Sequence, residues 1–240
     1  MKKIMALAAI MTLSACGGGG DSTSSPSVEG FWNGTLANGT AVNLAVLNGG
    51  ETWGIYQSAG SLVGAVYGKT TTMGYALSGS GTAFNFVTRS AGSGTYSGDF
   101  SEKTSINIKL SDGTQFTGKY DATYEQAAVL ATVAGTYTGT ALTVLATQAN
   151  TTVVVGANGN ISSSIVVGNQ SCATSGTAVA HPGGKNVYDL KLTFTGSYCA
   201  LGNGTTVTGV ATYNSKQNQI IAMALNGAKT DGLMFVGTKN

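Results

Sequence analysis

The chain has 240 residues, of which only 9% are charged and 36 are glycine. Its 12 basic and 10 acidic residues give a formal net charge of +2, so it lacks the positive excess that binding a nucleic-acid backbone requires. Scarce charge and abundant small residues are typical of short strands joined by tight turns.

The first fifteen residues have the pattern of an export signal. Lys2 and Lys3 precede an apolar run over residues 4–13, which is much shorter than the roughly 20 residues of a membrane-spanning helix. We therefore predict a signal peptide over residues 1–15. Its removal takes away Lys2 and Lys3, so the mature chain has 10 basic and 10 acidic residues and a formal net charge of zero.

The signal ends in Leu13-Ser14-Ala15-Cys16, which resembles the lipobox of bacterial lipoproteins. The resemblance implies that Cys16 carries a diacylglyceryl thioether and an acylated amino group, and several acyl chains anchor a protein stably. Gly17 after the cysteine points to the outer membrane. The alternative is a secreted protein in which Cys16 simply follows a cleavage site. Residues 16–27 are rich in Gly and Ser, and we expect a flexible tether there.

Two similar segments divide the rest of the chain. Val28-Glu29-Gly30-Phe31-Trp32-Asn33-Gly34-Thr35 returns as Val133-Ala134-Gly135-Thr136-Tyr137-Thr138-Gly139-Thr140. The match indicates a duplicated domain, with the first copy over residues 28–122 and the second over residues 134–240. A domain of about 100 residues is long enough to bury a modest core.

Apolar residues alternate with polar ones in the first domain, as in half-buried strands. Ile106, Ile108 and Leu110 form one such pattern and Phe116 to Tyr120 another, with the hairpin signal Asp112-Gly113 between them. The other strands expected after the opening segment are 41–47, 52–57, 62–67, 74–77, 83–88 and 94–100. A meander closed into a barrel would leave no exposed strand edge.

The second domain has the same style. Its expected strands are 137–146, 153–155, 164–167, 170–175, 188–194, 205–213, 219–225 and 233–238, with a turn at Asn158-Gly159. Between the domains, residues 123–133 contain good helix formers that end before Gly135. We therefore expect an all-β fold of two consecutive small antiparallel β-barrel or sandwich domains, joined by a short helical linker that covers a barrel end or lies between the domains.

Two cysteines remain after Cys16 is set aside. Cys172 and Cys199 form an even pair, which in an oxidising compartment predicts a disulfide. The alternative, a redox-active or metal-binding pair, lacks the CxxC spacing. If the disulfide forms, the strand that holds Cys172 and the strand at 188–194 are neighbours or face each other across a barrel.

Catalytic and metal-binding residues are sparse. The only histidine, His181, lies in a Pro-Gly-Gly turn, where we expect an exposed loop residue. Asp99, Glu102 and Asp112 are scattered over turns. We expect no enzyme, no metal and no cofactor. The alternative of an enzyme requires His181 to lie beside Asp189 or another acid in a cleft.

Aromatic residues gather in the first domain, at Phe31, Trp32, Trp53, Tyr56, Tyr67 and Tyr75. We expect them to fill the core. The alternative is that they line a pocket for a small apolar ligand.

The lipobox, the tether and repeated segments such as Gly94-Thr95-Tyr96-Ser97-Gly98 and Gly135-Thr136-Tyr137-Thr138-Gly139 resemble the two-domain β-barrel surface lipoproteins that include transferrin-binding protein B and factor H-binding protein. The resemblance implies the architecture and a binding role. We expect an outer-membrane lipoprotein, on the periplasmic or surface side, that acts as a non-catalytic binding module for a protein, glycan or small apolar ligand. The alternatives are a carrier, which needs an apolar cavity of several hundred Å³, and a structural or assembly factor of the envelope.

Overall fold

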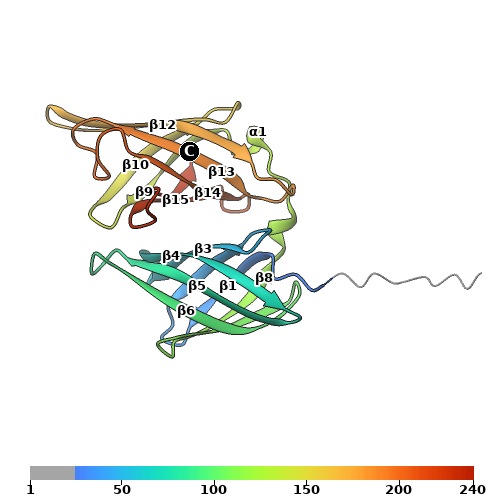
Figure 1. Ribbon diagram of the computed structural model, residues 1–240. Helices are drawn as coiled ribbons and strands as arrows, with labels where there is room; N and C mark the ends of the chain where they lie inside the picture. Colours follow the sequence, from blue (N-terminus) through green and yellow to red (C-terminus); the bar gives the residue numbers. More distant parts are fainter. Residues whose placement is uncertain (1–24) are drawn as a thin grey trace, which may run out of the picture.

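The computed structural model describes residues 25–240 and shows two closed antiparallel barrels of eight strands each (Figure 1). The all-β expectation is confirmed, and both domains are barrels rather than sandwiches. The signal peptide and Cys16 lie outside the described residues. No helix in the described part of the chain has the length and apolar character needed to cross a bilayer.

The first barrel is a meander in which each strand pairs with the next and β8 returns to pair with β1. Its strands are β1 (Gly30–Leu36), β2 (Ala41–Val46), β3 (Glu51–Ser58), β4 (Ser61–Met73), β5 (Ala76–Asn85), β6 (Ser90–Ser101), β7 (Ser105–Leu110) and β8 (Gln115–Asp121).

The second barrel repeats this topology and is closed by pairing of its first and last strands. Its strands are β9 (Gly135–Leu142), β10 (Thr147–Val155), β11 (Asn160–Val167), β12 (Gln170–Ala180), β13 (Tyr188–Thr195), β14 (Thr206–Asn214), β15 (Gln219–Leu225) and β16 (Gly232–Lys239).

The repeated sequence segment makes the same contact at the entrance of both barrels. In the first, Trp32 Nε1 donates a hydrogen bond of 2.9 Å to the carbonyl of Val28. In the second, the Tyr137 hydroxyl donates a bond of 2.7 Å to the carbonyl of Val133. Both aromatic side chains are fully buried. The duplication read from the sequence is therefore present in the side-chain contacts as well as in the topology.

The prediction of separate strands at 74–77 and 83–88 is wrong. These residues belong to the single strand β5 and its flanking turns, and β4 continues to Met73 before Gly74 turns the chain with a φ of 59°. The inward positions of β5 include Gly79 and Gly81, which carry no apolar side chain to mark the strand in the sequence. The strand predicted at 137–146 also ends earlier, at Leu142.

The linker contains much less helix than predicted for residues 123–133. It has a 3₁₀ turn over Ala122–Glu125 and one α-helical turn, α1 (Leu130–Val133). Between them, the Tyr188 hydroxyl bonds to both the N–H and the carbonyl of Val129, at 2.9 and 3.2 Å. These tertiary bonds take backbone groups that a continuous helix would use, so packing overrides helix propensity here. The Val133 side chain at the end of α1 is buried in the core of the second barrel.

Large side chains packed against glycine fill the first barrel. Trp32, Phe100, Ile106 and Phe116 belong to its interior cluster, which leaves a cavity of only about 60 Å³. A β-carbon added at Gly79 would overlap the ring of Tyr96, whose hydroxyl is held 2.6 Å from Thr70 Oγ1. The ring therefore cannot move away without losing that bond.

We predict that Gly79→Ala lowers the free energy of unfolding by about 1–3 kcal/mol, because the added methyl group overpacks this interior. Chemical denaturation measures the change. Gly92→Ala is the matched control, because Gly92 lies on the neighbouring strand β6 with open space where its β-carbon would be. Equal stability of the two variants would contradict this account of the packing.

Candidate functional site

The second barrel encloses a cavity of about 400 Å³, lined by residues from all eight of its strands. The cavity exists because several inward positions hold small side chains, among them Ser163, Thr174, Ala211 and Ala222. The interior of the first barrel instead contains large side chains, among them those of Trp32, Phe100 and Phe116. Similar barrels thus have different interiors, one filled and one hollow.

The cavity wall is apolar and carries no charged side chain. Leu190, Leu192, Phe194 and Phe235 supply much of the apolar surface, and the polar atoms come from Ser, Thr, Gln and Tyr residues. A charged ligand would lose its hydration here without gaining an ionic partner, which is costly. The wall therefore favours an uncharged, mainly apolar ligand.

The two ends of the cavity differ in exposure. At the linker end, Val133, Val155 and Tyr188 are buried, with exposed fractions of 1 to 3%. At the other end, Thr147 and Tyr198 line the cavity but are exposed. The cavity is therefore reached from the end formed by the β9–β10 and β13–β14 loops, away from the linker.

The disulfide between Cys172 and Cys199 fixes one side of this entrance. The bond is present, and β12 and β13 are neighbours, as the sequence predicted. It ties the β13–β14 loop, including Tyr198 and Leu201 of the cavity wall, to the end of β12. Closing a loop of this length stabilises a fold by about 3–4 kcal/mol in the chain-entropy model.

His181 lies in a different environment from the one expected. His181 lies in the loop between β12 and β13, as predicted, but the expected exposure is wrong, because its side chain is only 20% exposed and its Nδ1 lies 2.6 Å from Asp189 Oδ1. This is the pair that the enzyme alternative requires. Neither residue lines the apolar cavity, and among the described residues no hydroxyl or thiol hydrogen bonds to the other ring nitrogen. The Asp189 carboxylate therefore orients the His181 imidazole at the linker end of the second barrel.

The described residues contain no group of three or more His, Cys, Asp and Glu side chains arranged to hold a metal ion. Of the scattered carboxylates, Asp99 accepts a hydrogen bond from Asn107, and Asp112 accepts one from the backbone of Thr114. These bonds order turns and strand surfaces.

The aromatic residues of the first domain have three different environments. Trp32 and Tyr56 belong to the interior cluster, as expected for core residues. Phe31, Trp53 and Tyr67 instead face outward and pack at the contact with the second barrel, and Tyr75 is 61% exposed. None of them lines the 400 Å³ cavity. The cavity inside the second barrel is therefore built without the aromatic residues of the first domain.

One apolar cluster spans the two barrels. Phe31, Trp53 and Ile55 of the first barrel share it with Met223 and Met234 of the second. Lys229, on the β15–β16 loop, places its Nζ 4.5 Å from the centre of the Tyr67 ring, an arrangement in which a cation is attracted to the aromatic face. The barrels consequently lie side by side with their outer faces in contact (Figure 1).

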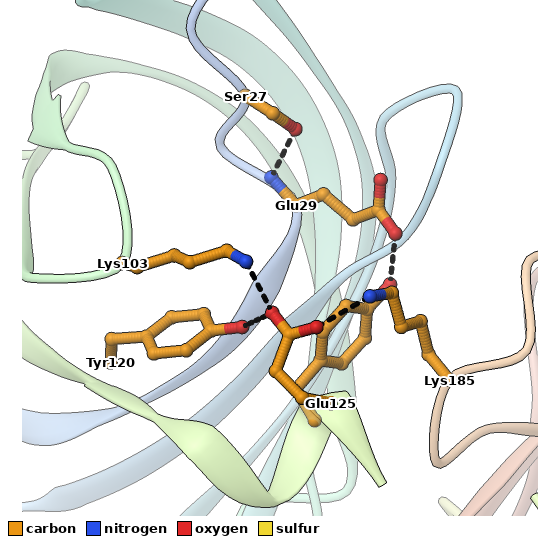
Figure 2. Close-up of polar contacts among 7 residues, drawn as sticks. Ser27, Glu29, Lys103, Tyr120, Glu125 and Lys185 are labelled. Atoms are coloured by element: carbon orange, nitrogen blue, oxygen red, sulfur yellow. Dashed lines mark hydrogen bonds and ion pairs between the residues drawn. The ribbon is translucent and has the colours of Figure 1, made fainter. Parts of the chain in front are cut away.

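A polar cluster at the linker end also joins the two barrels (Figure 2). Glu125 accepts hydrogen bonds from Lys103 at 2.8 Å and from the Tyr120 hydroxyl at 2.5 Å, both on the first barrel. Its second oxygen accepts from Lys185, which precedes β13, at 2.5 Å. The hydrogen bonds from Lys103, Lys185 and Tyr120 lower the pKa of Glu125 to about 2.

The lowered pKa of Glu125 predicts an acid-sensitive contact. A carboxylate with a depressed pKa stabilises the fold above its ordinary pKa of 4.5 and loses that contribution as the pH falls toward 2. We expect Glu125→Gln to lower the free energy of unfolding at pH 7 by about 0.2–1 kcal/mol, the range for solvent-exposed ion pairs. The difference from wild type should shrink between pH 4.5 and pH 2 in thermal unfolding measurements.

Glu102→Gln is the control, because the Glu102 side chain makes no hydrogen bond or ion pair among the described residues. It should change stability little at any pH. A Glu125→Gln difference that is unchanged from pH 7 down to pH 2 would refute the ionic origin of the contact.

No protein-family model matches this chain, and no curated protein is significantly similar to it in sequence.

Proposed function

We propose that this protein is an outer-membrane-anchored lipoprotein whose second barrel binds a small, uncharged apolar ligand. The observation that carries the proposal is the cavity of about 400 Å³ with no charged residue in its wall. Ligand pockets commonly have volumes of about 300–1,000 Å³ and mostly apolar walls with a few polar groups. The Thr and Gln residues near the entrance supply such groups.

The contrast between the barrels supports this proposal. The interior void of the first barrel is only about 60 Å³. The cavity of the second is more than six times larger at about 400 Å³. The first barrel shows that this topology can close around a filled core, so the topology itself does not require a cavity. A hollow interior in only one of two related barrels favours a specialised role for that barrel.

We propose a binding role without catalysis for the cavity. Its wall contains no His, Asp, Glu, Lys or Arg, and Cys172 is held in the disulfide. General acid–base chemistry needs a titratable group within reach of the ligand. The wall has two tyrosines for this role, but the Tyr188 hydroxyl is bonded to backbone groups of Val129 and Tyr198 lies at the exposed entrance. The cavity provides shape and apolar contact instead. The carrier alternative uses this same site and adds transport of the ligand.

The proposed ligand site can be tested with N-phenyl-1-naphthylamine, a neutral apolar dye whose fluorescence rises in apolar surroundings. We predict saturable binding with one dye per chain. Ala222→Phe should weaken binding by about tenfold or more, because Ala222 lines the cavity and a phenyl group would occupy ligand space.

Ala173→Phe is the matched control, since Ala173 is an exposed alanine of the same barrel that does not line the cavity. It should bind the dye as wild type does. If Ala222→Phe is folded and binds the dye equally well, the ligand site is elsewhere.

The proposed anchor can be tested separately. Cys16→Ala should release the protein from the membrane fraction, because the acyl chains attached at this cysteine would be lost. Fractionation of cells by ultracentrifugation, followed by immunoblotting, measures the released share. Ser14→Ala, which keeps the thiol, is the control and should remain membrane-bound. Wild-type retention of Cys16→Ala would remove the lipid anchor from the proposal without affecting the ligand site.

A further inference from the structure

A second cavity, of about 250 Å³, lies between the two barrels and is unlike the first in its lining. One wall is the outer face of β1, β2 and β3 with the end of β8. The opposite wall is the outer face of β14 and β15 and the turn that joins them. We refer to it as the interbarrel cleft. Neither barrel alone forms it.

Side-chain amides are concentrated in the interbarrel cleft. Asn and Gln make up 23 of the 240 residues in the chain but 6 of the 19 that line the cleft, about a threefold enrichment. These six amides come from both barrels: Asn33, Asn43, Gln57, Asn214, Gln217 and Gln219. The only charged residue in the lining is Asp121. The cleft therefore offers many hydrogen-bonding groups and little charge.

The wall on the first barrel is already ordered by a chain of hydrogen bonds. Asn43 donates to Asn33 at 2.8 Å, and Asn33 donates to Asp121 at 2.8 Å. Asp121 also accepts a hydrogen bond of 2.9 Å from the backbone N–H of Thr123. This bond holds the Asp121 carboxylate in place beside the linker. The side-chain oxygen of Asn43 accepts no hydrogen bond among the described residues. Because its own amide nitrogen is bonded to Asn33, this oxygen is already held in place, and accepting a hydrogen bond from a ligand would cost little side-chain entropy.

The wall on the second barrel has groups that are still available. The side chains of Thr212 and Gln219 form no hydrogen bond among the described residues, and neither does that of Gln57 on β3 across the cleft. Between the polar edges lie apolar side chains that include Phe31, Ile55 and Ile221. The cleft thus combines an apolar floor with uncharged donors and acceptors on both sides.

We infer that the interbarrel cleft binds a neutral carbohydrate. Amide groups donate and accept at once, as sugar hydroxyls do, so the two can form paired hydrogen bonds. The apolar floor suits the C–H face of a sugar ring. No Lys or Arg lines the cleft, so an anionic sugar or a phosphate would have no ionic partner.

A peptide fits the same cleft less well. Extended peptides usually bind by adding a strand to an exposed sheet edge. Both barrels are closed, so the described residues offer no free strand edge at the cleft. Recognition there must use side chains, and the available side chains match hydroxyl groups.

The test uses the full-length protein in mild detergent and isothermal titration calorimetry with three neutral oligosaccharides: maltohexaose, cellohexaose and N-acetylchitohexaose. We expect saturable binding of at least one. Asn43→Ala and Gln219→Ala should each weaken that binding by about tenfold, because they remove hydrogen-bonding groups from opposite walls, one held in place by Asn33 and one without a partner among the described residues. Asn107→Ala is the control, since Asn107 is an outward amide of the first barrel that lies outside the cleft.

Three results would overturn the inference. The first is that none of the three sugars binds saturably. The second is that a sugar binds but both cleft variants bind it as wild type does. The third is that no sugar binds, whereas an uncharged Gly-Ser-Asn decapeptide binds and the same variants abolish its binding. The last result would make the cleft a peptide site. Ala222→Phe, which fills the apolar cavity, should still bind the oligosaccharide, so failure of one site is distinguishable from failure of the other.

Discussion

The structure depends on a buried hydrogen bond at the entrance of each barrel, from an aromatic side chain to the carbonyl four residues before it. Trp32 bonds to Val28 in the first barrel and Tyr137 bonds to Val133 in the second. A buried donor without a partner costs about 1–3 kcal/mol, so these aromatic residues require the chain to enter along one path. That path places the first strand between the second strand and the last, where it closes the barrel.

Two barrels built around the same entrance have acquired different interiors. Large aromatic and branched residues fill the first, and its glycines allow close approach of those side chains. Small residues at inward positions leave the second hollow. The strand order is the same in both barrels, and the interiors differ in the volume of the side chains that point inward. The outer faces then join the barrels through Trp53 and its neighbours.

Part of this architecture could be predicted from the sequence. The strict alternation at Ile106, Ile108 and Leu110 correctly located β7, and the two copies of the repeated segment contain β1 and β9, the first strand of each barrel. Strand β5 was misplaced because Gly79 and Gly81 leave no periodic pattern. The cavity depends on summed side-chain volumes around a closed ring, and the His181–Asp189 contact depends on how the loop between β12 and β13 folds back. Patterns within a short stretch of sequence show neither the summed side-chain volume of a barrel interior nor the path of a loop. One available signal was missed: alternate positions of β3 hold Trp53 and Ile55, which face outward, and large apolar side chains on the outer face of a barrel indicate a covered surface.

The apolar cluster shared by the barrels has a consequence for biogenesis. The first barrel is synthesised before the second, and until its partner is complete it presents Phe31, Trp53 and Ile55 to its surroundings. Such half-made intermediates are prone to aggregate through the uncovered surface. A chain of this design therefore depends on its first barrel being kept unfolded, or shielded by a chaperone, until the second barrel is complete.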